Sequence, residues 1–214
     1  MFVDQSRSKN NGNKVVFGLF TPDSNPFGIP YREWTVRWWR WFLSQPKSTE
    51  PVGGRKISDN NTTANYQIYP EVWFLTGTTG GFAEKECDIP RGSALLCPII
   101  NFEISTAEDP NLKTDNDLVL YAKSDVDKIA KLNVEIDGFD LPDSKKFRVE
   151  SGPFDVILPD DNICGIKAGP TRAAADGYWF FLKPMTAGKH QIQFSGSCLA
   201  GTINIGSMYY LTIK

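Results

Sequence analysis

Two polar residues, Asn101 and Glu103, follow an apolar run at a spacing that places them together on a strand. Successive side chains of a strand alternate between its two faces, so a strand over residues 94–103 presents both on one side. The preceding positions on that face are apolar: Leu95, Cys97 and Ile99. A carboxylate partly buried there has a raised pKa unless it is paired, as a general acid or a metal ligand requires. If the protein is an enzyme, Glu103 is its first catalytic candidate, with Asn101 beside it.

Glu103 also has a structural interpretation, which the sequence favours. Arg37 and Arg40 lie on a strongly aromatic segment that must dock near the same sheet. Guanidinium groups that leave such a segment need partners, and a carboxylate supplies one in a fixed geometry. We therefore expect Glu103 to form a buried ion pair with Arg37 or Arg40. In the alternative arrangement Glu103 lines an open site.

His190 is the single histidine of the chain and the third catalytic candidate. A strand over residues 189–195 places it on one face with Ile192 and Phe194, and that face is apolar. A lone histidine in this setting more often bonds a backbone carbonyl than acts as an acid-base catalyst. No Ser-His-Asp or Cys-His arrangement is recognisable around it. His190 is therefore predicted to be structural.

Further carboxylate oxygens come from residues 160–162 and from Asp176, both predicted to lie in loops. They lack the spaced Asp-x-Asp-x-Asx-Gly order of a calcium loop, and ordinary turn chemistry explains them. The chain has no C-x-x-C pair, and His190 has no cysteine at ligand spacing. The sequence therefore predicts no metal and no cofactor, and Asp176 remains a candidate for ligand binding.

The segment over residues 31–43 contains four of the six tryptophans and is predicted to be a helix. At 100° per residue Trp34, Trp38 and Trp41 form a narrow stripe, while Trp39 lies off it. The segment is apolar nearly all round, so it is either buried or offers aromatic surface to a sugar or a partner. We favour burial as a plug on the sandwich, because exposing so many tryptophans invites aggregation. Pro46 ends the helix.

The four cysteines permit three pairings. Cys87–Cys97 and Cys164–Cys198 are the natural pairs, because each closes a loop within one half of the chain. Four reduced, buried thiols are the alternative. The sequence favours disulfides, which indicate an oxidising compartment.

Many short strands with turn residues between them predict a mainly β fold, a single antiparallel β-sandwich of jelly-roll or immunoglobulin-like type. The sandwich spans residues 15–214 and follows a flexible tail over residues 1–14. A second helix is predicted near residues 115–131, capped by Thr114 or Asp115. A hairpin is predicted at Asp137-Gly138. Separate strands are predicted at residues 147–150 and 154–158.

The net charge of −2 and the pI near 5.5 give no general electrostatic reason to bind nucleic acid. No apolar run approaches the 18 or more residues of a membrane span, and none resembles a signal-peptide core. We therefore expect either a cytoplasmic protein or the mature form of an exported one.

Several motifs occur in order along residues 27–213. They are Tyr31-Arg-Glu-Trp-x-x-Arg-Trp-Trp-Arg-Trp, Val72-Trp73-Phe74-Leu75-x-Gly77-Thr78, Cys87-x-Ile89-Pro90-x-Gly92, Asp176-Gly177-Tyr178-Trp179 and Pro184-x-x-x-Gly188-Lys189-His190. As a set they resemble a family of uncharacterised, mostly exported microbial β-sandwich-like proteins with a Trp-rich N-terminal helix. The resemblance implies an extracellular, periplasmic or cell-surface location, and it carries over no catalytic residue.

Two classes of function follow. The first is a non-catalytic exported β-sandwich that binds a glycan, an envelope component or a protein partner. The second is a small carboxylate-dependent hydrolase or lyase that acts on a carbohydrate-like substrate. The missing nucleophile–base pair favours the first. An exposed cleft with two carboxylates about 5–10 Å apart would favour the second.

Overall fold

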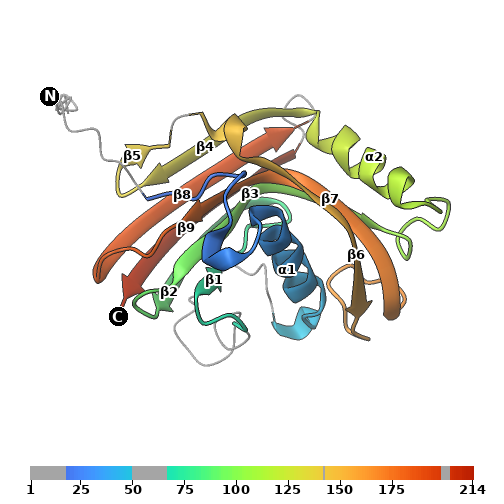
Figure 1. The fold of residues 1–214 in the computed structure, drawn as a ribbon, viewed down its shortest axis with the longest axis horizontal. Coiled ribbons are helices and arrows are strands. Elements are labelled where there is room, and N and C mark those ends of the chain that lie inside the picture. The colour runs from blue at the N-terminus through green and yellow to red at the C-terminus, as the bar shows by residue number, and fades with distance from the viewer. Residues whose placement is uncertain (1–17, 50–66, 142, 199–202) are drawn as a thin grey trace, which may run out of the picture.

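The computed structural model describes residues 18–49, 67–141, 143–198 and 203–214. The tail predicted over residues 1–14 lies outside these ranges. The described chain forms two facing sheets, with helix α1 (Tyr31–Leu43) against the far side of one of them (Figure 1). The predicted β-sandwich with a Trp-rich helix and a second helix is confirmed.

The four-stranded sheet has the order β1-β3-β7-β6. Its strands are β1 (Val72–Phe74), β3 (Ala94–Ser105), β6 (Arg148–Leu158) and β7 (Gly169–Leu182). The long apolar runs of β3 and β7 are buried on both faces, because the second sheet covers one face and α1 covers the other.

The five-stranded sheet has the order β2-β9-β8-β4-β5. Its strands are β2 (Gly81–Ile89), β4 (Ile129–Ile136), β5 (Phe139–Asp140), β8 (Gly188–Cys198) and β9 (Ile203–Ile213). Burial alternates along β8 and β9, as expected of a sheet with one buried face. Pairing is antiparallel except at two edges, where β1 runs parallel to β3 and β2 runs parallel to β9.

The space between the sheets is filled by an inter-sheet core drawn from both, which includes Cys97, Phe180, Phe194 and Tyr209. On the other face of the four-stranded sheet lies a separate helix core, in which α1 packs its tryptophans against Phe74, Trp179 and Phe181.

Helix α1 is buried almost all round, as predicted. Trp34, Trp38 and Trp41 are each at most 3% exposed. The indole nitrogens of two of them donate to main-chain carbonyls, Trp34 to Pro26 at 2.9 Å and Trp38 to Leu75 at 2.8 Å. The helix is therefore a plug on the sheet, and its tryptophan stripe offers no exposed stacking surface.

Helix α2 (Asp115–Val126) begins where the sequence predicts and ends earlier. Thr114 and Asp117 form a reciprocal capping box at its start. The predicted continuation to residue 131 is wrong, because Ile129 already begins β4 and pairs with Cys198. Within the described ranges there are also three short 3₁₀ turns: Pro26–Gly28, Lys47–Thr49 and Ser144–Phe147. Within the described ranges no helix is long and apolar enough to span a membrane.

The strand predictions were correct where the signal is local. The hairpin at Asp137-Gly138 is present, and both residues have the positive φ that this turn requires. The predicted strands at residues 147–150 and 154–158 are instead one strand, β6, interrupted by a bulge. The sequence does not predict β2, because its alternation of charged and apolar residues is weak and it begins within a glycine pair, at Gly81.

The predicted disulfides are wrong: Cys87, Cys97, Cys164 and Cys198 are all free thiols. Cys198 lies in the inter-sheet core, whereas Cys164 packs against the helix core, so the four-stranded sheet separates them. Cys87 and Cys97 stand in facing sheets, and each thiol contacts the carbonyl of the next residue, at 3.7 and 3.6 Å.

Candidate functional site

The polar end of β3 is turned toward α1 by an irregularity in its pairing. The register between β3 and β7 shifts between Pro98 and Ile100. A bulge of one residue exchanges the two faces of a strand for every residue after it. Leu95 and Cys97, before the shift, face the inter-sheet core, and so does Ile100 after it.

Asn101 and Glu103 therefore lie on the opposite face from the one predicted. They point to the α1 side of the sheet, where both line a cleft with the helix. Gly177 on β7 pairs with Asn101, and a Cβ at this position would fall 2.1 Å from the Asn101 Cβ. Glycine here is what lets the asparagine occupy this face.

The cleft has a volume of about 400 Å³ and lies between one side of α1, β3, the segment over residues 77–79, the loop that follows β6 and the start of β9. Its apolar wall comes from α1, β3 and β9, and its polar end from the last residues of β3, the turn after it and the loop. Its lining includes Trp38, Trp39, Phe42, Asn101, Glu103, Glu108 and Cys164.

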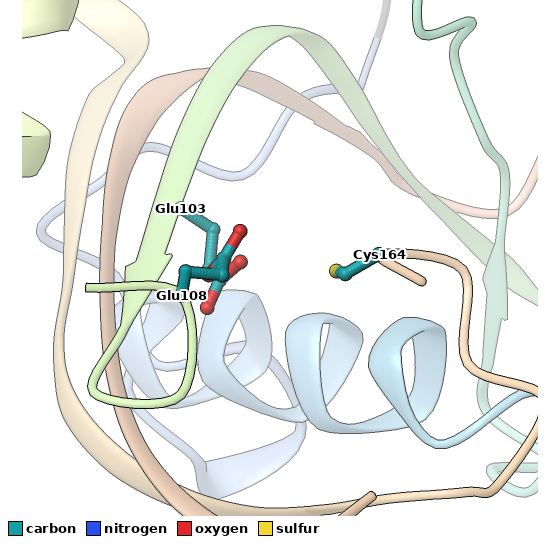
Figure 2. A group of neighbouring side chains, drawn as sticks. All are labelled: Glu103, Glu108 and Cys164. Atoms are coloured by element: carbon teal, nitrogen blue, oxygen red, sulfur yellow. The ribbon is translucent and has the colours of Figure 1, made fainter. Parts of the chain in front are cut away.

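Glu103, Glu108 and Cys164 come together at the polar end. One ligand atom of each lies within 4.8 Å of the others. Figure 2 shows the carboxylates of Glu103 and Glu108 side by side, with the sulfur of Cys164 pointing toward them. Glu103 lies on β3, Glu108 on the turn after it, and Cys164 on the loop between β6 and β7.

Glu108 is positioned by its own turn. Its Oε2 accepts hydrogen bonds from the Ser105 backbone N–H at 2.9 Å and from the Ser105 hydroxyl at 2.7 Å. In this Ser-x-x-Glu turn the glutamate reaches back to the serine N–H, as in one half of a capping box. This local bond brings the second carboxylate to the site, where it shares a hydrogen bond with Glu103.

Three buried polar atoms of cleft residues have no hydrogen-bond partner among the described residues. They are the Asn101 Nδ2, the Glu103 Oε1 and the Trp39 Nε1. Leaving a buried donor or acceptor unpaired costs about 1–3 kcal/mol each, so proteins rarely keep several together without a use. A bound ligand or ion would supply the missing partners.

The electrostatics of the site favour protonated forms of its acids. Burial raises the pKa of Glu103 well above its usual range, and the adjacent carboxylate of Glu108 raises it further. Burial also raises the pKa of the Cys164 thiol to about 12, with smaller contributions from the charges of Glu108 and Glu103. A cation at this place would reverse both preferences.

The predicted ion pair of Glu103 with Arg37 or Arg40 is wrong. Arg37 pairs with Glu33 at 3.4 Å and lies over the Trp34 ring. Arg40 donates to the Asp155 carbonyl at 3.0 Å. Both arginines leave other sides of α1 than the one that faces the cleft, so they find partners on the helix itself and on β6.

The other predicted site residues do not join the cleft. Trp34 and Trp41 are buried in the helix core. Asp176 was expected in a loop but lies within β7, where its carboxylate accepts from Arg148 at 2.6 Å. His190 lies on β8, with Nδ1 2.7 Å from an Asp137 carboxylate oxygen and Nε2 2.9 Å from the Thr186 carbonyl.

Sequence reasoning missed three residues of the site. Glu108 had the spacing to Ser105 as a signal. Trp39 is not among the predicted ligand-binding tryptophans, because it lies off their stripe. Its position off the stripe is why it reaches the cleft. Cys164 was assigned to a disulfide, and no local signal marks it as a neighbour of Glu103.

No protein-family model matches the chain, and no curated protein matches it. No family is assigned. Two solved structures have a distant similarity to its fold. PbICP-C, in a complex with falcipain-2, is 11% identical, with a TM-score of 0.28, and the match covers 67% of this chain and 99% of that one. The cysteine protease inhibitor EhICP2 from Entamoeba histolytica is 12% identical, with a TM-score of 0.25, and the match covers 67% and 96%. Similarity at this level carries no functional argument.

Proposed function

We propose that this protein is a binding module whose cleft takes a neutral, hydroxyl-rich ligand such as a sugar unit of a glycan. The observation that carries the proposal is the group of unpartnered polar atoms beside an aromatic wall. Asn101 Nδ2 and Trp39 Nε1 are donors that need an acceptor, and Glu103 Oε1 needs a partner of its own. A hydroxyl group both donates and accepts, so a polyol satisfies all three.

The charge of the cleft supports a neutral ligand over an anionic one. Among the described residues, no lysine, arginine or histidine lines it. A phosphate or carboxylate ligand needs such a group, or a set of free backbone N–H groups, to replace its hydration. Beside two glutamates, an anion would also be repelled.

The aromatic wall supplies the apolar part of the interaction. Trp38, Trp39 and Phe42 line the cleft from α1, and Trp38 is stacked on Phe42 with ring centroids 4.8 Å apart. Trp38 itself is only 2% exposed, so the C–H face of a sugar ring would pack on the edges of Trp39 and Phe42, which are 6% and 7% exposed, while its hydroxyls bond the polar end. A volume of about 400 Å³ is that of a small-molecule site.

The spacing of the two carboxyl groups favours binding over hydrolysis. Their nearest ligand atoms lie within 4.8 Å, whereas glycosidases hold their carboxyl groups about 5–5.5 Å or about 6.5–9.5 Å apart. Figure 2 shows the two carboxylates side by side, whereas a glycosidase holds its two carboxyl groups on either side of the glycosidic bond. The hydrolase remains the weaker candidate.

We also propose that the protein is exported, and only the sequence resemblance to the family of mostly exported proteins supports this. The cysteine argument for an oxidising compartment no longer supports it, because the described cysteines are unpaired.

A ligand-observed NMR screen tests the proposal, using neutral monosaccharides and disaccharides with a uronic acid as the charged comparison. We expect saturation transfer to at least one neutral sugar and none to the uronate. Asn101→Ala should weaken the dissociation constant about tenfold, since one hydrogen bond is worth about 0.5–1.5 kcal/mol. Asn133→Ala is the matched control, an exposed asparagine on β4. Binding of no neutral sugar, or equal binding by both variants, would contradict the proposal.

A further inference from the structure

We infer that Glu103, Glu108 and Cys164 form a binding site for a divalent cation of the zinc class. The cluster is the one group of three such ligand side chains that comes together within the described residues, with its ligand atoms within 4.8 Å of one another. The inference concerns the polar end of the cleft, and it does not require that a sugar binds there.

A second observation points to a missing ion, independently of the clustering. The Glu103 Oε1 is fully buried and no described group donates to it. No basic side chain of the described cleft lining neutralises the two carboxylates. A buried, unpaired carboxylate is costly, and proteins meet that cost by protonating it, by pairing it with a base or by coordinating a metal, so an ion here would displace the proton that Glu103 otherwise holds.

The distances are compatible with coordination after a small contraction. Metal bonds of about 2.0 Å to oxygen and about 2.3 Å to sulfur place tetrahedral ligands roughly 3.3–3.5 Å apart. Glu103 lies on β3, while Glu108 and Cys164 lie on connecting segments, so coordination requires these two side chains to approach Glu103. Glu108 keeps its Ser105 bonds through Oε2, and the ion would replace the hydrogen bond that its carboxyl group shares with Glu103.

The donor set selects the ion. Calcium and magnesium take oxygen ligands, and a thiolate is a poor ligand for either. Copper(I) prefers an all-sulfur set. Two carboxylates and one thiolate are a borderline set, which suits Zn²⁺ and its spectroscopic substitute Co²⁺.

Three protein ligands leave one tetrahedral position open, as in catalytic rather than structural zinc sites. Here the open position faces the cleft, because all three ligands line it. An ion so placed would be exchangeable and would present a coordination site to whatever small molecule enters.

Calorimetric titration of the chelator-treated full chain with Zn²⁺ tests the inference. We expect one equivalent to bind, with Ca²⁺ and Mg²⁺ binding at least about 100-fold more weakly. Co²⁺ should give a thiolate-to-metal charge-transfer band in the near ultraviolet. Cys164→Ser should abolish that band, and Glu103→Gln should weaken Zn²⁺ binding by more than about 100-fold, the upper limit for loss of an outer ligand partner.

The control is Glu84→Gln, an exposed glutamate on β2 that should bind Zn²⁺ as the parent does. A band that survives Cys164→Ser, or binding unaffected by Glu103→Gln, would overturn the inference. Absence of Zn²⁺ binding in the parent, with circular dichroism showing a folded chain, would overturn it equally.

The same samples separate this inference from the proposed function. Cys164 is a proposed metal ligand that the sugar proposal does not use, so Cys164→Ser should weaken Zn²⁺ binding and retain sugar binding. Sugar binding without Zn²⁺ binding would refute the metal site alone. Zn²⁺ binding without sugar binding would refute the sugar proposal alone.

Discussion

Two ionisable side chains, Lys85 and Glu103, are buried in different layers of the molecule, and they differ in how completely they are hydrogen-bonded. Lys85, on β2, faces the inter-sheet side, and its ammonium group donates to the Thr76 carbonyl, the Thr76 hydroxyl and the Gly77 carbonyl. It also lies 5.4 Å from the centre of the Tyr209 ring. Glu103, on the helix side, has an oxygen with no described donor.

The difference indicates a structural role for Lys85 and a candidate binding role for Glu103. A lysine ammonium has three donors, and Lys85 uses all three, which fixes the segment after β1 on the core. Glu103 sits in an incomplete network, in which a ligand or ion has room to act. Buried polar networks stabilise a fold when every member is bonded, and an unbonded member calls for an explanation such as a ligand, an ion or a water.

The same contrast divides two neighbouring tryptophans and gives the largest expected effect. Trp38 donates to the Leu75 carbonyl, whereas the Trp39 indole N–H has no described partner. Trp38→Ala should lower the free energy of unfolding by about 3–5 kcal/mol, as a large-to-small core change. Trp38→Phe should lower it by about 1–3 kcal/mol, because the Leu75 carbonyl is left unbonded.

Trp39→Phe serves as the comparison: it removes the same ring volume but an N–H with no described partner, so it should cost less than Trp38→Phe. Urea denaturation of the three variants measures the differences. Equal costs for the two phenylalanine variants would remove the distinction between bonded and unbonded indoles.

Lys85→Met tests the completed network. The substitution keeps the apolar stem but leaves the Gly77 carbonyl without this donor, and we expect a loss of about 1–3 kcal/mol at pH 7. Burial lowers the pKa of Lys85 from 10.5 to about 8. Between these values the unfolded chain binds more protons, so the lysine makes the folded protein more stable as pH rises.

The gap between parent and Lys85→Met should therefore widen from pH 8 toward pH 10.5, as followed by chemical denaturation across that range. A gap that stays constant would show that Lys85 titrates normally and is more exposed to water than the hydrogen bonds indicate.

Glu103→Gln should raise the stability of the fold at pH 7, whereas Lys85→Met lowers it. We expect an increase on the order of 1 kcal/mol in the free energy of unfolding. Burial raises the pKa of Glu103 above 4.5, so its contribution to stability is present below that pH and is lost as pH rises through the raised value. Glutamine does not titrate, so the metal-free variant should exceed the parent in melting temperature at pH 7 and match it near pH 4. The ion pair predicted from sequence requires a marked loss of stability instead.

His190 gives the smallest expected effect. Burial alone would lower its pKa, but the hydrogen bonds to Asp137 and to the Thr186 carbonyl outweigh burial and raise it above 6.5. Stability from this pair is present below pH 6.5 and is lost as pH rises through the raised value. Asp137→Asn should cost less than about 1 kcal/mol at pH 6 and almost nothing at pH 9. Proton NMR of the single histidine measures its pKa directly. An unchanged pKa in Asp137→Asn would show that Asp137 does not raise the pKa of His190.

The amino-acid sequence determined the elements whose signals are local. The aromatic periodicity of residues 31–43 specified a buried helix, because no other placement hides indoles on every side. Thr114 and Asp117 specified the start of α2, and Asp137-Gly138 specified a hairpin, because caps and tight turns are set by a few adjacent residues.

The tertiary structure alone decided the site. A bulge after Pro98 turned Asn101 and Glu103 away from the face that strict alternation assigns them, and pairing with β7 fixes that bulge. Cys164 reaches Glu103 from a loop about sixty residues away, and the sheet between Cys164 and Cys198 excludes the pairing that spacing suggested. Strand register and contacts between distant segments depend on how the layers pack. A local sequence pattern carries no information about that packing.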